Sequence, residues 1–158
     1  MIEKSDFKNI ISKDKIEAKL DLSRILKGVE SDRKRDISAK IARALREAVG
    51  DDAVNKAQSS VTGKKFKKLS KAYQKIKKAQ GKGGKANLVL DGDMLGALRE
   101  SNGVQTVTMK IKGEKEILKA YNHFTGDTLP KRQALPDEGE AFRPGIIKIL
   151  NGILKDEL

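Results

Sequence analysis

The chain has 158 residues, of which 37% are hydrophobic and 35% are charged, and its formal net charge is +12. This composition is typical of one globular domain, residues 1–158, with a true core and a strongly basic surface. No run approaches the roughly 18 apolar residues of a membrane span, so we expect no membrane contact. The chain has no cysteine, which excludes disulfides, thiol nucleophiles and cysteine zinc sites.

The first half of the chain predicts a strand followed by a long helix. We treat residues 1–14 as a candidate flexible arm. Residues 15–22 alternate apolar and charged side chains, as in a half-buried strand, although residues 22–29 also show helical spacing and leave its end open. Ser31 and Asp32 are suited to cap a helix, and the apolar pattern that follows predicts a helix over residues 32–49 that stops at Gly50.

The middle of the chain predicts two loops and two helices. Residues 51–65 have weak periodicity and indicate a loop. From Phe66 to Gln80, apolar residues recur at steps of three and four, which predicts an amphipathic helix before a glycine-rich loop at residues 81–87. Residues 93–100 indicate a further short helix.

The last third predicts a hairpin and a final helix. Residues 104–112 alternate strictly and predict a strand, with residues 117–122 pairing back as a second strand. Residues 143–154, with Pro144 near the first turn, carry the broad apolar stripe of a helix. The fold class predicted is α+β, a small antiparallel sheet packed against the long helix of the first half and the C-terminal helix, with long loops.

Residues 120–136 combine the single histidine with two aromatics, a glycine and two of the three prolines. The aromatics need a surface to bury against, the glycine permits a tight turn, and the prolines favour extended backbone around Arg132. We therefore expect a shaped loop that follows a strand and leads to the last helix. The residues expected to shape it are Tyr121, His123, Phe124, Gly126, Pro130, Arg132 and Leu135.

This window resembles the virion morphogenesis (tail completion) proteins of tailed bacteriophages. The shared pattern is an aromatic residue, then His-x-x-Gly, then Pro-x-Arg-x-x-Leu-Pro, followed by a C-terminal helix. The segments FKKLSKAYQK at residues 66–75 and LVLDGDMLGAL at residues 88–98 resemble two other elements of that family, in the same order. The resemblance implies a structural neck or tail protein without enzymatic activity or cofactor. It also implies a homo-oligomeric ring of about six or twelve subunits that binds other head–tail or tail proteins, is made in the bacterial host cytoplasm and resides in the virion.

A second functional hypothesis comes from a lysine-rich stretch, which we call the basic segment (residues 64–85). Such a surface suits phosphate contact through counterion release, without base-specific readout, because it has lysine rather than arginine and few aromatics. The alternatives are contact with acidic neighbouring subunits or a solvated face with no dedicated partner. The lysines concerned are Lys64, Lys65, Lys67, Lys68, Lys71, Lys75, Lys77, Lys78, Lys82 and Lys85.

Enzyme hypotheses find little support in the sequence. One histidine cannot build a multi-histidine metal centre, and Asp91-Gly92-Asp93 lacks the further ligands of a calcium loop. The glycines of residues 81–85 have no Ser or Thr after the lysine, so they do not form a P-loop. We therefore expect no catalytic, metal or cofactor residues, and we expect His123 to stabilise a turn.

Overall fold

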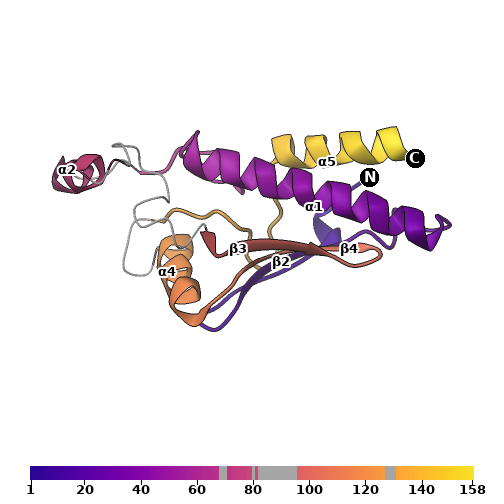
Figure 1. Ribbon diagram of the computed structural model, residues 1–158, viewed down its shortest axis with the longest axis horizontal. Coiled ribbons are helices and arrows are strands. Elements are labelled where there is room, and N and C mark those ends of the chain that lie inside the picture. The colour runs from indigo at the N-terminus through magenta and orange to yellow at the C-terminus, as the bar shows by residue number, and fades with distance from the viewer. Residues whose placement is uncertain (68–70, 80, 82–95, 127–130) are drawn as a thin grey trace.

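The structure is a computed structural model that describes residues 1–67, 71–79, 81, 96–126 and 131–158, and its fold is α+β (Figure 1). In chain order the elements are a 3-10 helix η1 (Lys4–Asp6), β1 (Phe7–Ile11), β2 (Ile16–Asp21), α1 (Ser31–Val54), α2 (Lys71–Ala79), β3 (Leu98–Asn102), β4 (Thr106–Ile111), α4 (Glu114–Thr125) and α5 (Pro144–Glu157).

The strands form one antiparallel four-stranded sheet in the order β1-β2-β4-β3. Its central pair joins strands far apart in sequence, with Ala18 opposite Met109 and Leu20 opposite Val107. These side chains share one face because alternate residues of a strand point the same way. That inner face is apolar, and Val107 and Met109 on it are fully buried.

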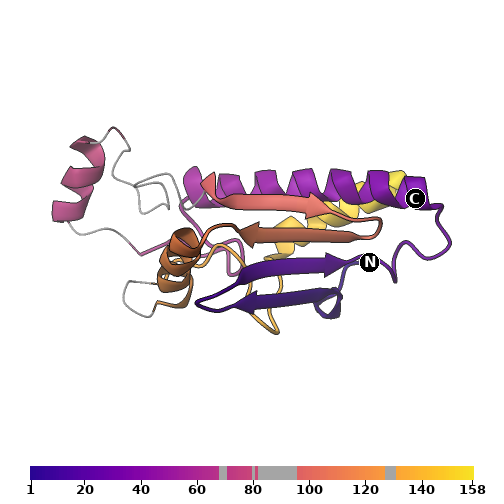
Figure 2. The ribbon, with the colours of Figure 1, turned by 60° about the horizontal axis from the view of Figure 1, so that its bottom comes forward.

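Helices α1 and α5 cover the inner face of the sheet. Figure 1 shows both helices on one side of the strands, and in Figure 2 α5 lies behind the strands while α1 runs along the β3 edge of the sheet. Helix α1 presents Ile37, Ile41 and Leu45 to the sheet, and these residues belong to the same hydrophobic core as Ile146 and Leu150 of α5. The predicted packing of a sheet against these two helices is therefore confirmed.

Helix α1 is longer than predicted and continues to Val54. We expected Gly50 to end it, but the apolar positions continue at four-residue steps through Val49 to Ala53, and both side chains are buried. Burial of this stripe outweighs the modest cost of about 1 kcal/mol for a glycine inside a helix. Only the remainder of the predicted 51–65 loop is non-helical, and a bridge between Gln58 and Lys65 closes it.

Two further predictions near the sheet are wrong. Residues 117–122, predicted as a strand, lie in α4, because Ile117, Ala120, Tyr121 and Phe124 recur at the spacing of one helical face. Residues 98–100, predicted as the end of a helix, belong to β3, where Leu98 lies opposite Ile111. The start of that predicted helix, residues 93–95, lies outside the described residues.

Residues 1–14, the candidate arm, are instead part of the folded body. They contain η1 and β1, and β1 pairs along its length with β2. The side chains of Ile2 and Phe7 are buried, and the backbone N–H of Ile2 donates to Oδ1 of Asn151 in α5 at 3.0 Å. Phe7 also packs edge-on against Phe142, with ring centroids 5.7 Å apart.

Helix α2 lies apart from the sheet and the other helices, at one end of the molecule (Figure 1). Its described part covers Lys71–Ala79, within the predicted helix of residues 66–80. Phe66, expected on that helix, is buried in the main core instead. Most of the predicted loop at residues 81–87 lies outside the described residues.

Candidate functional site: the 120–136 segment and the basic segment

The 120–136 segment begins on α4 rather than after a strand. Phe124 is 2% exposed in the core, while Tyr121 and His123 are half-buried on the same helix. The ammonium of Lys13, in the β1–β2 turn, lies 5.8 Å from the centre of the Tyr121 ring, a cation–π distance. The aromatics therefore fix α4 to the core and to the neighbouring hairpin.

Gly126 ends α4 in the left-handed conformation, as the predicted turn requires, with φ of 73°. A side chain here would meet the chain that returns beside it, because a Cβ added to Gly126 would lie 3.0 Å from the Cβ of Lys131. The return is held by the Arg132 N–H, which donates to the carbonyl of His123 at 2.6 Å. Pro130, one of the predicted loop residues, lies outside the described residues.

After this turn the chain runs through the interior of the body. Residues 132–136 are all buried, including Leu135, which is fully enclosed. The Nη2 of Arg132 donates to the carbonyl of Lys67 at 3.2 Å, so the segment touches the start of the basic segment. Nε2 of Gln133 donates to Glu140 Oε1 at 2.7 Å and holds the following turn. The described residues of this segment thus lie close together, mostly inside the molecule.

A buried polar network, which the sequence did not reveal, joins the end of α1 to the start of α5. Asp52 is fully buried, and its carboxylate accepts two hydrogen bonds from Arg143, from Nε at 2.8 Å and Nη2 at 2.9 Å. It also accepts from Ser60 Oγ at 3.1 Å and Gln58 Nε2 at 3.0 Å. The hydrogen bonds from Arg143 to Asp52 raise the pKa of Arg143 above its usual value. Because all four bonds are internal, the network has a structural role.

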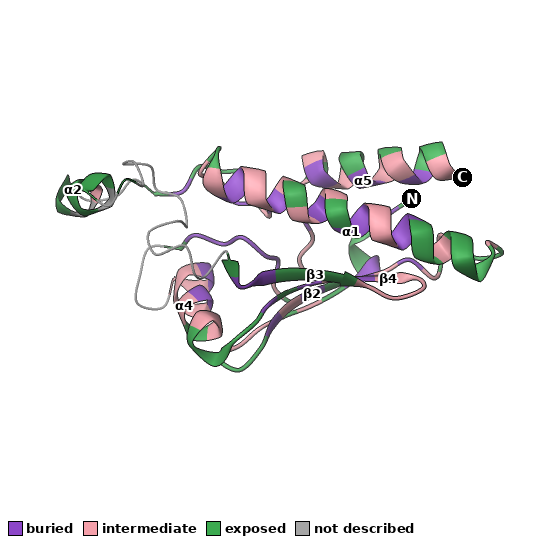
Figure 3. Ribbon diagram, in the orientation of Figure 1, coloured by how far each residue is buried: buried purple, intermediate pink, exposed green. Residues whose placement is uncertain are grey.

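The lysines of the basic segment are exposed wherever the structure describes their side chains. Lys64, Lys65 and Lys67 are exposed in the chain before α2, and Lys71, Lys75 and Lys78 are exposed on α2. In Figure 3 this helix is coloured almost entirely as exposed. The side chain of Lys77, and the residues Lys68, Lys82 and Lys85, lie outside the described part.

Helix α2 also exposes an apolar side chain. Ile76 is 49% exposed, although helices of globular proteins normally bury such residues against the body. No described helix or strand packs extensively against α2. The structure therefore leaves an amphipathic, basic helix without a covered apolar side among the described residues.

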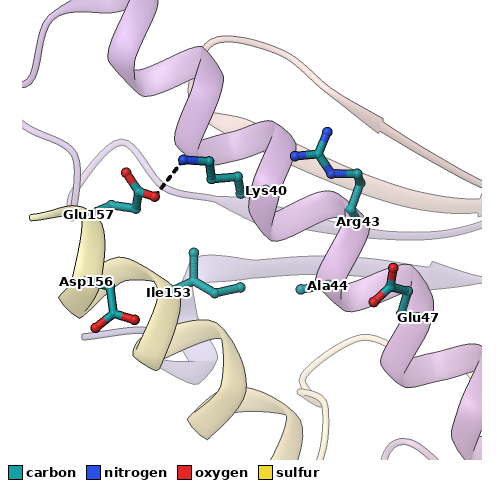
Figure 4. A pocket seen from close by; sticks show the side chains of 7 residues that line it. All are labelled: Lys40, Arg43, Ala44, Glu47, Ile153, Asp156 and Glu157. Atoms are coloured by element: carbon teal, nitrogen blue, oxygen red, sulfur yellow. Dashed lines mark hydrogen bonds and ion pairs between the residues drawn. The ribbon is translucent and has the colours of Figure 1, made fainter.

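A groove of about 340 Å³ lies between α1 and the end of α5 (Figure 4). Its walls are mixed in charge, with Lys40, Arg43 and Glu47 on α1 and Asp156 and Glu157 on α5, and among these Lys40 and Glu157 point toward each other. The ammonium of Lys40 forms an ion pair across the groove with the Glu157 carboxylate, at 2.6 Å. The hydrogen bond to Glu157 raises the pKa of Lys40, and this ion pair joins the two helices across the groove.

Neither the described residues nor known proteins supply a further functional assignment. Within the described part of the chain, no three histidine, aspartate or glutamate side chains gather where they could hold a metal ion. Among the described helices, none has the length and apolar character needed to cross a membrane. Comparisons with protein-family models, curated proteins and solved structures find no match.

Proposed function

We propose that this chain is a structural subunit of a tailed-bacteriophage virion, a tail-completion or neck component that assembles into a homo-oligomeric ring. The proposal rests on the sequence resemblance and on one observation, the projecting α2 with its exposed Ile76. A helix of nine residues has little stability of its own in water. Its apolar side gains most from burial against a neighbouring subunit, and ring subunits make such head-to-tail contacts.

The test compares two isoleucines of equal exposure. Ile76→Glu places a charge on the apolar side of α2, whereas Ile149→Glu does so on α5, where Ile149 is 48% exposed. Analytical ultracentrifugation and negative-stain electron microscopy of the full chain would measure ring formation. We expect rings from the wild type and Ile149→Glu, and monomers from Ile76→Glu with an unchanged circular dichroism spectrum. A wild type that stays monomeric at high concentration, or rings from Ile76→Glu, would overturn the proposal.

The second candidate is a small nucleic-acid-binding protein that contacts phosphates through the basic segment without sequence preference. The supporting observation is the exposure of every lysine of this segment whose side chain is described. Its test is the triple variant Lys71→Glu, Lys75→Glu and Lys78→Glu. This hypothesis predicts that the variant loses salt-sensitive DNA binding as a monomer, whereas the assembly hypothesis alone predicts no DNA binding to lose.

A further inference from the structure

The outer face of the sheet, turned away from α1 and α5, carries an ordered set of basic and hydroxyl side chains. Figure 2 turns this face toward the viewer, with no helix lying across its centre. The strand register aligns the outward positions in rows across the sheet. We define the basic outer face by six of these residues: Lys8, Lys19, Arg99, Ser101, Thr108 and Lys110.

This face has two pairs of like-charged residues, and the two members of each pair lie directly opposite each other on neighbouring strands. Lys8 is opposite Lys19 on the neighbouring strand, and Arg99 is opposite Lys110. All four side chains are exposed. Like charges directly opposite in a sheet destabilise it. The fold therefore holds four basic groups in an arrangement that an anionic ligand would stabilise.

The acidic residues on the same side of the sheet do not cancel these charges one for one. Glu17, which lies opposite Lys110, forms an ion pair with Lys15 in the β1–β2 turn at 3.2 Å. Asp21 accepts a hydrogen bond from the N–H of Ser23 at 2.9 Å, which lowers the pKa of Asp21, and the charges of Lys8 and Lys19 lower it further, so Asp21 offsets part of that pair. On the four strands, four outward basic residues face these two acidic ones, a net charge of +2. Glu138, in the turn before α5, lines the same hollow as Lys8 and Lys19 and reduces the net charge of the face to +1.

We propose that the basic outer face binds the phosphate backbone of duplex nucleic acid. The row Lys8, Lys19, Thr108 and Ser101 combines ammonium groups with hydroxyls, and both are common donors to phosphate oxygens. Neighbouring strands are about 4.8 Å apart, so three intervals span about 14 Å. This width separates Lys8 on β1 from Arg99 on β3, so basic groups can reach phosphates on both sides of a major groove about 12 Å wide.

The chemistry of the face favours a duplex over two other partners. On the described strands no aromatic side chain occupies an outward position, so the stacking platform that binds single strands is missing there. The only outward apolar side chain on these strands is Ile10 at the edge. A protein interface normally has an apolar centre within a polar rim, and this face has the opposite arrangement.

The experiment measures binding of the full chain to a mixed-sequence duplex of about 25 base pairs over roughly 50 to 200 mM salt. The face variant combines Lys8→Gln, Lys19→Gln, Arg99→Gln and Lys110→Gln. A matched control removes four exposed charges elsewhere, with Lys27→Gln, Lys115→Gln, Lys148→Gln and Lys155→Gln. A third variant neutralises α2 through Lys71→Gln, Lys75→Gln and Lys78→Gln. Because the face substitutions remove both like-charged pairs, we expect the face variant to keep the wild-type melting temperature.

We expect the slope of log affinity against log salt to fall by up to about 3.6 in the face variant, since each of the four phosphate contacts contributes about 0.9. The control should change the slope by less than about one. No wild-type binding, an equal loss in the control, or a loss confined to the α2 variant would overturn the inference. The inference would also be overturned if poly-glutamate competed for the protein as strongly as unlabelled duplex does. The inference does not depend on ring formation, because binding is measured on monomer and assembled protein alike.

Discussion

The Asp52 carboxylate shows how one buried residue can connect segments far apart in sequence. It lies in the last turns of α1 and bonds to Ser60 in the following loop and to Arg143 before α5. The backbone supports the same link, because the Arg143 N–H donates to the Ser60 carbonyl at 2.7 Å. A buried charge that loses its partner is strongly destabilising, whereas removing the whole pair is often tolerated.

We therefore predict that Asp52→Asn lowers the free energy of unfolding by about 3 kcal/mol, because Arg143 keeps its charge in a largely buried site. The double variant Asp52→Leu with Arg143→Met should be more stable than Asp52→Asn. Urea unfolding followed by circular dichroism measures both. As a control, Asp36→Asn removes an exposed ion pair to Lys40 and should cost less than about 1 kcal/mol. Equal effects at the two aspartates would contradict the structural role of the network.

A second carboxylate, Asp6, gives a pH-dependent prediction. Two hydrogen bonds from Arg24, at 2.8 and 3.2 Å, hold the pKa of Asp6 below its usual 3.8. A lowered folded-state pKa contributes stability above the unfolded pKa and loses it as pH falls through the folded value. The stability gap between the wild type and Asp6→Asn should thus be constant from about pH 5 to 7 and narrow below about pH 4.

Thermal melts across this pH range measure that gap. The control is Asp14→Asn, which removes an exposed carboxylate of the β1–β2 turn and is melted over the same pH range. A gap of constant size down to about pH 2 would show that Arg24 does not favour the ionised form of Asp6.

At the scale of elements, the sequence predicts best where one periodicity dominates. The strict alternation before Ile111 and the apolar stripe of the C-terminal helix both gave the right element. The prediction is wrong where a helix end or a short apolar run is interpreted without regard to the helical spacing around it. Gly50 suggests a helix end, although Ala53 continues the apolar stripe of α1, and residues 117–122 resemble a strand, although their apolar residues have helical spacing.

The remaining errors depend on contacts that no local pattern contains. Leu98 lies in a strand because β4 offers it a partner at Ile111, and β1 forms because β2 pairs with it. The candidate site shows the same limit. The residues of the 120–136 segment were found by composition, but the Asp52 network and the basic outer face arise only from tertiary pairing. Their only sequence signals are lysines at alternating strand positions and an acidic residue inside an apolar stripe.

We expect the same glycine-to-alanine substitution to have opposite effects on stability at two positions. One glycine ends a helix, and the other lies inside a helix. Gly126→Ala puts a side chain at φ of 73° and 3.0 Å from the Lys131 Cβ, so we expect it to cost about 1–2 kcal/mol. Gly152→Ala, inside α5 with open space around it, should stabilise the protein by up to about 1 kcal/mol. Chemical denaturation measures both variants. Destabilisation of similar size at the two positions would contradict the tight turn after α4.

At the scale of the whole molecule, the two proposed surfaces lie on different parts of the fold. The assembly surface is on α2, at one end, and the basic outer face is on the sheet (Figures 1 and 2). The core beneath the sheet is continuous from Phe7 to Leu154. A charge-altering change on α2 can therefore disturb assembly while the sheet keeps its structure, which makes the two proposals separable by mutation.

This separation also predicts uneven stability across the chain, measurable by amide hydrogen exchange. Core amides of α1 and β4 should exchange only through global unfolding, whereas amides of α2 should exchange close to the unprotected rate, since a nine-residue helix without extensive packing is marginal. If α2 is buried between subunits, its protection should rise with protein concentration, and Ile76→Glu should abolish that rise while Ile149→Glu preserves it. Protection of α2 equal to that of α1 in dilute monomer would contradict both the projecting helix and its proposed role in assembly.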